Sequence, residues 1–167
     1  MLNKILFSPS NSWVDKILKI LVLPFFSFLN LFNFKDRAGR VEFICFFAFS
    51  TFFNIINKIL FNNENLLDGF PTLILFLSLI LNLINILILI TATSLICRRF
   101  HDLNLSGLYS LFIFMFIALS MLSSIFFNNV LLSLDFIISY LIGIGFLMIK
   151  KGSTKANHYG QPIIFKI

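Results

Sequence analysis

The chain has 167 residues, of which 59% are hydrophobic and 12% are charged, and its mean hydropathy is +0.97. Soluble domains carry about 25% charged residues, and disordered chains are poor in aromatic residues, whereas this chain has 24 phenylalanines, so both classes are excluded. The net charge of +6 does not indicate nucleic-acid binding, because the basic residues flank long apolar runs and form no basic face.

The first apolar segment, Ile17–Phe34, has the pattern of an amphipathic helix at a membrane surface. Pro24 interrupts it and Lys19 lies inside it, which argues against a membrane-spanning helix. At helical spacing its polar residues share one face, opposite leucines and phenylalanines. These polar residues are Lys16, Lys19, Ser27, Asn30 and Asn33. We therefore expect residues 1–40 to form a cytoplasmic N-terminus that carries an interfacial helix.

Four later segments are apolar and long enough to cross a bilayer, which takes about 20 helical residues each. They are Val41–Phe61, Thr72–Ile96, Leu108–Phe127 and Val130–Ile149. The predicted fold is thus an all-α integral membrane protein, a four-transmembrane-helix bundle over residues 41–149. A basic cytoplasmic tail over residues 150–167 follows it. Such a chain has no room for a separate soluble enzyme domain.

The distribution of basic residues predicts the orientation of this bundle. Six lysines and arginines precede the first span, two follow the second, and four lie in the tail, so that only Lys58 falls on the other side. Because basic residues accumulate on the cytoplasmic side of membranes, we expect both termini in the cytoplasm. The two cysteines, Cys45 and Cys97, then lie near the cytoplasmic ends of helices, where a structural disulfide is not expected.

Three polar segments interrupt the apolar chain, and this orientation brings all three to the cytoplasmic side. Their sequences are FKDRAGRVEF at 34–43, RRFHDLNLSG at 98–107 and NHYGQP at 157–162. In order and spacing they resemble the bacterial inner-membrane family catalogued as domain of unknown function 805. That family has an arginine-rich entry to its first span, an R-R-[LF]-H-D-x-x-x-S-G-W loop and an N-x-[FY]-G tail.

The resemblance covers about residues 34–162, and the Arg-Arg-Phe-His-Asp loop is its specific part. Two family tryptophans are replaced by Ile44 and Leu108, which bears on the depth of the helices more than on chemistry. The resemblance implies a small multi-pass protein of the bacterial inner membrane and implies no reaction. It also suggests that the tail motif folds back onto the loop; this motif comprises Asn157, Tyr159, Gly160 and Pro162.

Charged residues at the expected membrane surface predict a clamp between helix ends. Glu42 enters the first span at the depth at which Arg98 and Arg99 leave the second, so Glu42 should pair with one of these arginines. Asp102 could pair with Arg37 or Arg40. Such pairs would anchor the helices, and this anchoring role is the simplest interpretation.

The alternative interpretation of the same residues is a cytoplasmic anion site for a lipid headgroup. Its donors would be arginine side chains together with a histidine, a serine hydroxyl and a backbone amide near the start of the third span. These candidates are Arg37, Arg40, Arg98, Arg99, His101, Ser106 and Gly107. The expected partners are anionic membrane lipids, with a protein partner or a second copy of the chain as alternatives.

No enzyme, cofactor or metal site is predicted. Cys97 and His101 share a helical face, but two ligands without a third make a poor zinc site. His101 and Asp102 could handle a proton, yet no nucleophile motif or phosphate-binding loop accompanies them. The function alternative to a binding module is a subunit of a small transporter or channel.

Polar residues at matched spacing on the first two spans bear on that alternative. They are Ser50, Asn54 and Asn57 on the first span and Ser78, Asn82 and Asn85 on the second. Each set defines one helix face. Such residues commonly form hydrogen bonds between membrane helices, which is the interpretation preferred here over a permeation path.

Overall fold

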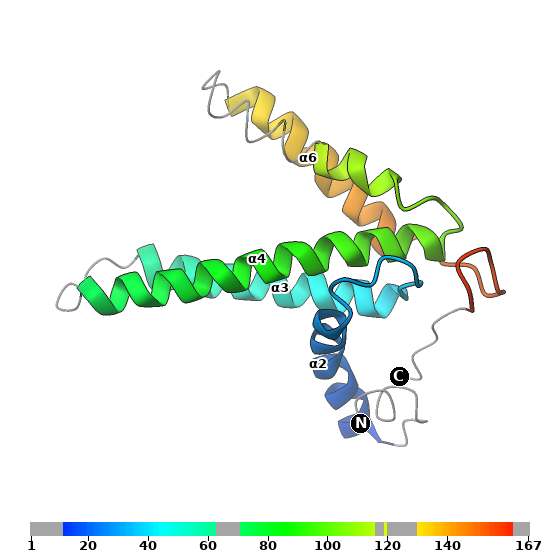
Figure 1. The fold of residues 1–167 in the computed structure, drawn as a ribbon, viewed down its shortest axis with the longest axis horizontal. Helices are drawn as coiled ribbons and strands as arrows, with labels where there is room; N and C mark the ends of the chain where they lie inside the picture. Colours follow the sequence, from blue (N-terminus) through cyan, green and yellow to red (C-terminus); the bar gives the residue numbers. More distant parts are fainter. Residues whose placement is uncertain (1–11, 63–70, 116–118, 120–129, 162–167) are drawn as a thin grey trace. The chain divides into compact units, whose positions relative to one another are not determined.

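The computed structural model describes residues 12–62, 71–115, 119 and 130–161. Over these residues the regular structure is helical, and an antiparallel bridge between Asn157 and Gly160 is isolated from any sheet. The helices are α2 (Trp13–Leu29), α3 (Arg40–Asn62), α4 (Pro71–Asp102) and α6 (Val130–Ile149) (Figure 1). Residues 109–115 add further helical turns. The predicted all-α class is therefore confirmed for the described chain.

Two of the helices are long and apolar enough to cross a membrane. These segments are Arg40–Leu60, with a mean hydropathy of 1.7, and Leu75–Asp102, with a mean hydropathy of 2.5. Only 17% and 11% of their most apolar stretches are buried inside the protein, whereas the core helix of a soluble protein is mostly buried. Their large aliphatic and aromatic side chains thus remain available to lipid.

The helix bounds agree with the apolar segments except at one end of α4. Helix α3 extends the predicted first span by one residue at each end, and α6 coincides with the predicted fourth span. Helix α4 begins at Pro71, where a proline is favoured because its missing amide donor would be unpaired anyway. The predicted third span, 108–127, lies mostly outside the described residues.

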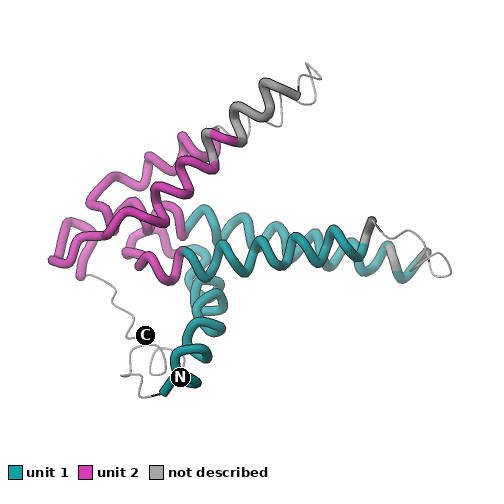
Figure 2. The backbone as a smooth tube through the Cα atoms, turned by 180° about the vertical axis from the view of Figure 1, so that it is seen from behind, with its two compact units in different colours: residues 1–32, 44–94, 166–167 teal, residues 33–43, 95–165 magenta. Residues whose placement is uncertain are grey.

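The chain forms two compact units, shown in different colours in Figure 2. Unit 1 comprises residues 1–32, 44–94 and 166–167, and unit 2 comprises residues 33–43 and 95–165. Helices α3 and α4 contribute to both: their long apolar parts belong to unit 1, and their ends at Arg40 and Asp102 belong to unit 2. The three polar segments singled out in the sequence therefore fall in unit 2.

In unit 1, helix α2 packs against α3 through aromatic rings. Phe28 contacts Phe46 and Phe49 edge-on, with ring centroids 5.6 and 6.0 Å apart, and Phe25 lies 6.1 Å from Phe49. The Ser94 hydroxyl of α4 donates to the Asn30 carbonyl at 3.1 Å, which fixes the end of α2 against α4. Aromatic contacts of this kind add to the burial of the rings themselves.

The predicted interfacial helix differs from α2 in its bounds. It was expected over Ile17–Phe34, whereas α2 begins at Trp13 and ends at Leu29. The Ser12 hydroxyl accepts a hydrogen bond from the Asp15 amide at 3.1 Å, an N-cap signal that places the start four residues earlier. At the other end the Asn30 side chain donates to the Phe26 carbonyl at 2.9 Å and closes the last turn.

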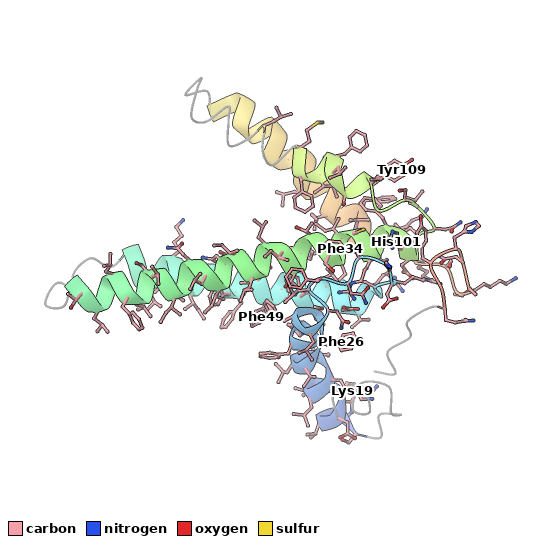
Figure 3. The ribbon with its side chains drawn as sticks, in the orientation of Figure 1. Lys19, Phe26, Phe34, Phe49, His101 and Tyr109 are labelled. Carbon is pink, nitrogen blue, oxygen red and sulfur yellow. The ribbon has the colours of Figure 1, made fainter. Side chains whose placement is uncertain are left out.

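The polar face of α2 is turned into the protein, which also differs from expectation. A helix lying at a membrane surface would turn this face to the headgroups. Lys19, labelled in Figure 3, and Ser27 are instead buried, whereas Trp13 and Leu21 on the apolar side are exposed. The Ser27 hydroxyl can be buried because it donates to the Leu23 carbonyl of its own helix at 3.3 Å.

Helix α4 continues six residues beyond the predicted second span and carries the Arg-Arg-Phe-His-Asp motif on its last turns. No glycine or proline precedes the motif, so nothing ends the helix at Ile96. It ends in a Schellman motif: the Leu105 amide donates to the Phe100 carbonyl at 2.9 Å and the Asn104 amide to the His101 carbonyl at 3.0 Å. Asn104 has φ +60°, the left-handed conformation of this cap.

We expect Asn104→Gly to fold as stably as the parent chain and Asn104→Val to be less stable by about 1–2 kcal/mol, because β-branched residues are strained in the left-handed region. The free energy of unfolding in detergent micelles measures both variants. An Asn104→Val variant as stable as Asn104→Gly would contradict this assignment of the cap.

Candidate functional site

The last turn of α4 is the centre of a buried network of charged groups in unit 2. Arg98, Arg99 and Asp102 are all at least nine-tenths buried, together with Arg37 from the segment before α3. Buried charges are tolerated only when they are paired and hydrogen-bonded. Each of these residues must therefore find its partners inside the fold.

Arg98 pairs with Glu42 of the first turn of α3. The Arg98 Nη1 and Glu42 Oε1 atoms are 3.1 Å apart, and both side chains are buried. The Ala38 amide also donates to the Arg98 carbonyl at 3.1 Å, which holds the chain before α3 against the end of α4. The pair is one of the two that the sequence predicted for Glu42, and it joins the ends of the two helices.

Asp102 accepts hydrogen bonds from two arginines at once. Its Oδ1 atom lies 2.6 Å from Arg37 Nη2 and 3.1 Å from Arg37 Nε, a forked contact, and its Oδ2 atom accepts from Arg99. We call Arg37, Asp102 and Arg99 the arginine clasp. Gly152 passes so close to this carboxylate that a Cβ at position 152 would collide with it. Asp102 thus pairs with one of the two arginines considered for it in the sequence, and additionally with Arg99.

The remaining donors of Arg37 bind the backbone of the C-terminal tail. Its Nη1 atom donates to the carbonyls of Lys155 at 3.0 Å and Gly160 at 3.2 Å. Its Nη2 atom also donates to the Ser153 carbonyl and hydroxyl. In return the Ser153 amide donates to the Asp102 carbonyl at 2.9 Å. Arg37 therefore holds the tail directly, and this contact explains why a short polar segment folds back onto α4.

Arg99 uses its donors in the same way on the end of α6. Its Nε atom donates to the Leu147 carbonyl at 2.9 Å, and its Nη2 atom donates to the Lys150 carbonyl. Its Nη1 atom donates to the Ala38 carbonyl at 3.3 Å as well as to Asp102. The planar guanidinium can serve these three directions together, which an ammonium group cannot. The clasp thus joins the segment before α3, the end of α4, the end of α6 and the tail.

His101 precedes Asp102 on the last turn of α4 and also contacts the tail. Its ring stacks on Tyr159, with centroids 3.8 Å apart and planes at 5°. Its Nδ1 atom is 3.2 Å from the Asp36 carbonyl and donates to it, because a carbonyl oxygen only accepts. The Asn157 side chain donates to the His101 carbonyl at 2.8 Å. His101 is therefore not oriented by Asp102, and the two do not form an acid–base pair.

The tail motif forms a tight turn between Asn157 and Gly160. The two residues exchange backbone hydrogen bonds of 3.1 Å, and the Asn157 side chain accepts from the Tyr159 amide at 2.9 Å. Gly160 has φ +112°, a conformation that favours glycine. Three of the four tail residues singled out in the sequence thus build one turn against α4, and Pro162 lies outside the described residues.

The other candidate residues are not members of the clasp. Arg40 is exposed. The Ser106 hydroxyl accepts from the Leu108 amide at 3.3 Å, so it starts the helical turns at 109–115. Gly107 approaches Cys97 so closely that a Cβ at position 107 would collide with the sulfur. The structure does not bring Ser106 and Gly107 into contact with the guanidinium groups of the clasp.

Cys97 and His101 are neighbours, with Sγ and Nε2 3.9 Å apart. Within the described residues no group of three or more metal-ligating side chains is present. Sequence reasoning overlooked the acceptors of the clasp, because they are backbone carbonyls and carry no side-chain signal. The one residue-level clue to them is Gly152, which stands between basic residues where the tail must approach Asp102 closely.

The family comparison agrees with the resemblance seen in the sequence. The profile of the family described as Protein of unknown function (DUF805) matches residues 31–161. No curated protein and no solved structure matched the chain. Because the matched region covers most of the chain and contains every residue of the clasp, the chain belongs to this family, as predicted.

Replacing Arg37 by lysine tests the clasp. We expect Arg37→Lys to lower the free energy of unfolding by about 1.5–3 kcal/mol, because a single ammonium group cannot replace the forked contact to Asp102 and the tail carbonyls together. Arg40→Lys, at an exposed site three residues away, should change it by less than about 0.5 kcal/mol. Thermal unfolding in detergent micelles compares the two, and equal shifts would contradict the assignment.

Proposed function

We propose that this protein is a non-catalytic module of the bacterial inner membrane whose cytoplasmic face binds anionic lipid headgroups. In this proposal four segments span the membrane, namely α3, α4, residues 108–127 and α6, and both termini lie in the cytoplasm. The exposed apolar surfaces of α3 and α4 and the basic residues around the clasp support it.

One observation carries the headgroup proposal: the clasp binds the backbone of the tail lysines. Arg99 holds the Lys150 carbonyl and Arg37 holds the Lys155 carbonyl, while both lysine side chains are exposed. The clasp thereby fixes where these ammonium groups leave the protein. Arg40 and Lys151 are exposed as well, and we call Arg40, Lys150, Lys151 and Lys155 the basic rim. Each basic residue near an anionic membrane contributes about 1 kcal/mol of attraction.

The division between clasp and rim refines which residues would touch a headgroup. The donors of Arg37 and Arg99 are directed at Asp102 and backbone carbonyls, so these arginines would act as a scaffold. The rim keeps its charges exposed and would make the electrostatic contact. Lysine suits this role because its strongly hydrated charge on a flexible stem needs no fixed geometry.

The two residues best suited to acid–base chemistry, Asp102 and His101, are both held in other contacts, which fits a non-catalytic role. The Asp102 carboxylate is neutralised by two guanidinium groups, and the His101 ring is covered by Tyr159 on one face. A general base needs a proton-accepting atom within reach of a substrate.

The second candidate function, a subunit of a small transporter or channel, is favoured by a polar cavity between α3 and α4 in unit 1.

Reporter fusions test the proposed topology. Reporters that follow Lys35, Asp102 and Lys155 should read as cytoplasmic, and a reporter inserted at Asn65 should read as external, because 12 of the 13 basic residues then lie inside. A cytoplasmic reading at Asn65 would overturn the four-span arrangement.

Lipid binding by the rim is tested by neutralising the tail lysines. We expect the triple variant K150Q/K151Q/K155Q to bind phosphatidylglycerol roughly 10–100-fold more weakly than the parent, in proportion to the charge removed. Native mass spectrometry with added phosphatidylglycerol and phosphatidylcholine measures the retained lipid. Lys58→Gln, which removes an exposed lysine on α3 in unit 1, is the matched control and should bind as the parent does.

Two outcomes would contradict the headgroup proposal. Undiminished phosphatidylglycerol binding by the triple variant would show that the rim is not the contact. Equal retention of phosphatidylcholine by the parent would show that the negative charge of the lipid is not recognised.

A further inference from the structure

A polar cavity lies between α3 and α4 in unit 1, close to the exposed Lys58 of α3. Its volume is about 290 Å³, and it is lined by Asn57 of α3 and by Ser78, Leu81, Asn82 and Asn85 of α4. None of these side chains is charged. Small-molecule sites begin at about 300 Å³, so the cavity has the size of a small organic solute.

Asn57 distinguishes this cavity from ordinary polar helix packing. Its Nδ2 and Oδ1 atoms are both buried, and neither has a hydrogen-bond partner among the described residues. Its neighbours behave differently: the Asn54 side chain donates to the Ser50 carbonyl at 2.9 Å, and the Ser78 hydroxyl donates to the Leu75 carbonyl at 2.8 Å. A buried carboxamide normally finds partners, so the Asn57 amide leaves one donor and one acceptor function for a ligand.

The position of the cavity along the helices is also informative. At 1.5 Å per residue, about 25 Å of helix separates Arg40 from Asn57, and about 20 Å separates Asn85 from Arg98. In the proposed membrane orientation the cavity therefore lies near the outer surface of a hydrocarbon core about 30 Å thick, next to Lys58, which falls on the outer side. A buried amide without a hydrogen-bond partner is disfavoured at any depth, so the Asn57 carboxamide favours a polar occupant of the cavity.

From these observations we infer that the cavity is a binding site for a small neutral solute with several hydroxyl groups, of the polyol class. A hydroxyl group both donates and accepts, so it complements the Asn57 carboxamide and the carboxamides of Asn82 and Asn85. The uncharged lining disfavours an ion, which would lose its hydration without gaining a counter-charge. The inference takes only the membrane depth from the proposed function and does not depend on lipid binding.

Glycerol is the probe for this site, and saturation-transfer NMR on the detergent-solubilised full chain is the measurement. The parent should transfer saturation to glycerol and at least fivefold less to lactate, which has a similar size but carries a charge. Asn57→Leu should abolish the glycerol signal. Asn54→Leu is the matched control, since it removes a carboxamide one turn away that is already bonded to the Ser50 carbonyl, and it should retain the signal.

Leucine at position 57 replaces an unpartnered buried amide, so this variant is expected to fold at least as stably as the parent. Thermal unfolding checks this point in the same samples. The inference is overturned if the parent gives no glycerol signal, if lactate binds as well as glycerol, or if Asn57→Leu retains the signal. A loss of oligomeric mass in Asn57→Leu by native mass spectrometry would also overturn it, because a second copy of the chain would then be the partner of Asn57. Failure of the tail-lysine experiment would leave these results unaffected.

Discussion

The buried carboxylate of Asp102 is the group on which the cytoplasmic end of this protein depends. Arg37 and Arg99 both donate hydrogen bonds to it. Their remaining N–H groups donate to backbone carbonyls of three chain segments. Without Asp102, two positive charges would be buried side by side with no counter-charge. Removing one partner of a buried ion pair is strongly destabilising. The packing of α6 and the tail against α4 therefore depends on Asp102.

The buried arginines of the clasp and the exposed lysines of the rim have different roles. Arg37 and Arg99 are buried in the clasp, where a rigid planar fork can bind several carbonyls at once, whereas the three rim lysines carry a hydrated charge that can contact a surface of changing geometry. The clasp holds two arginines and one aspartate, so it keeps one net positive charge. The rim residues are exposed, and the clasp binds the backbone of two of them, Lys150 and Lys155.

Polar groups are few in this apolar chain, and each buried one needs a hydrogen-bond partner. In unit 2 most buried charged groups bond to ion-pair partners or backbone carbonyls, although Arg98 Nε and Nη2 have no hydrogen-bond partner among the described residues. In unit 1 most polar side chains of α3 and α4 bond to carbonyls of their own helix, as Ser50, Thr51 and Thr91 do. Asn57 does not. This contrast makes the Asn57 cavity a site for a ligand instead of another example of helix packing.

Much of the fold could be read from the chain. Continuous apolar runs set the bounds of α3 and α6, because the backbone groups of a bilayer-length apolar run find hydrogen-bond partners within a helix and none in lipid. The pairing of Glu42 with either Arg98 or Arg99 was predicted because all three residues stand where an apolar run begins or ends, and the structure selects Arg98. The family motifs further indicated that the tail would return to the Arg-Arg-Phe-His-Asp segment.

Other features were decided only by the tertiary structure. The sequence did not show that α4 continues to Asp102, that the polar face of α2 is buried, or that Asp102 binds two arginines. The reason is physical: helix periodicity and membrane depth depend on local composition, which a sequence displays directly. The partners of a guanidinium group are backbone carbonyls brought together by folding, and carbonyls are the same in every residue. Which of them Arg37 and Arg99 bind is therefore settled only when the segments meet.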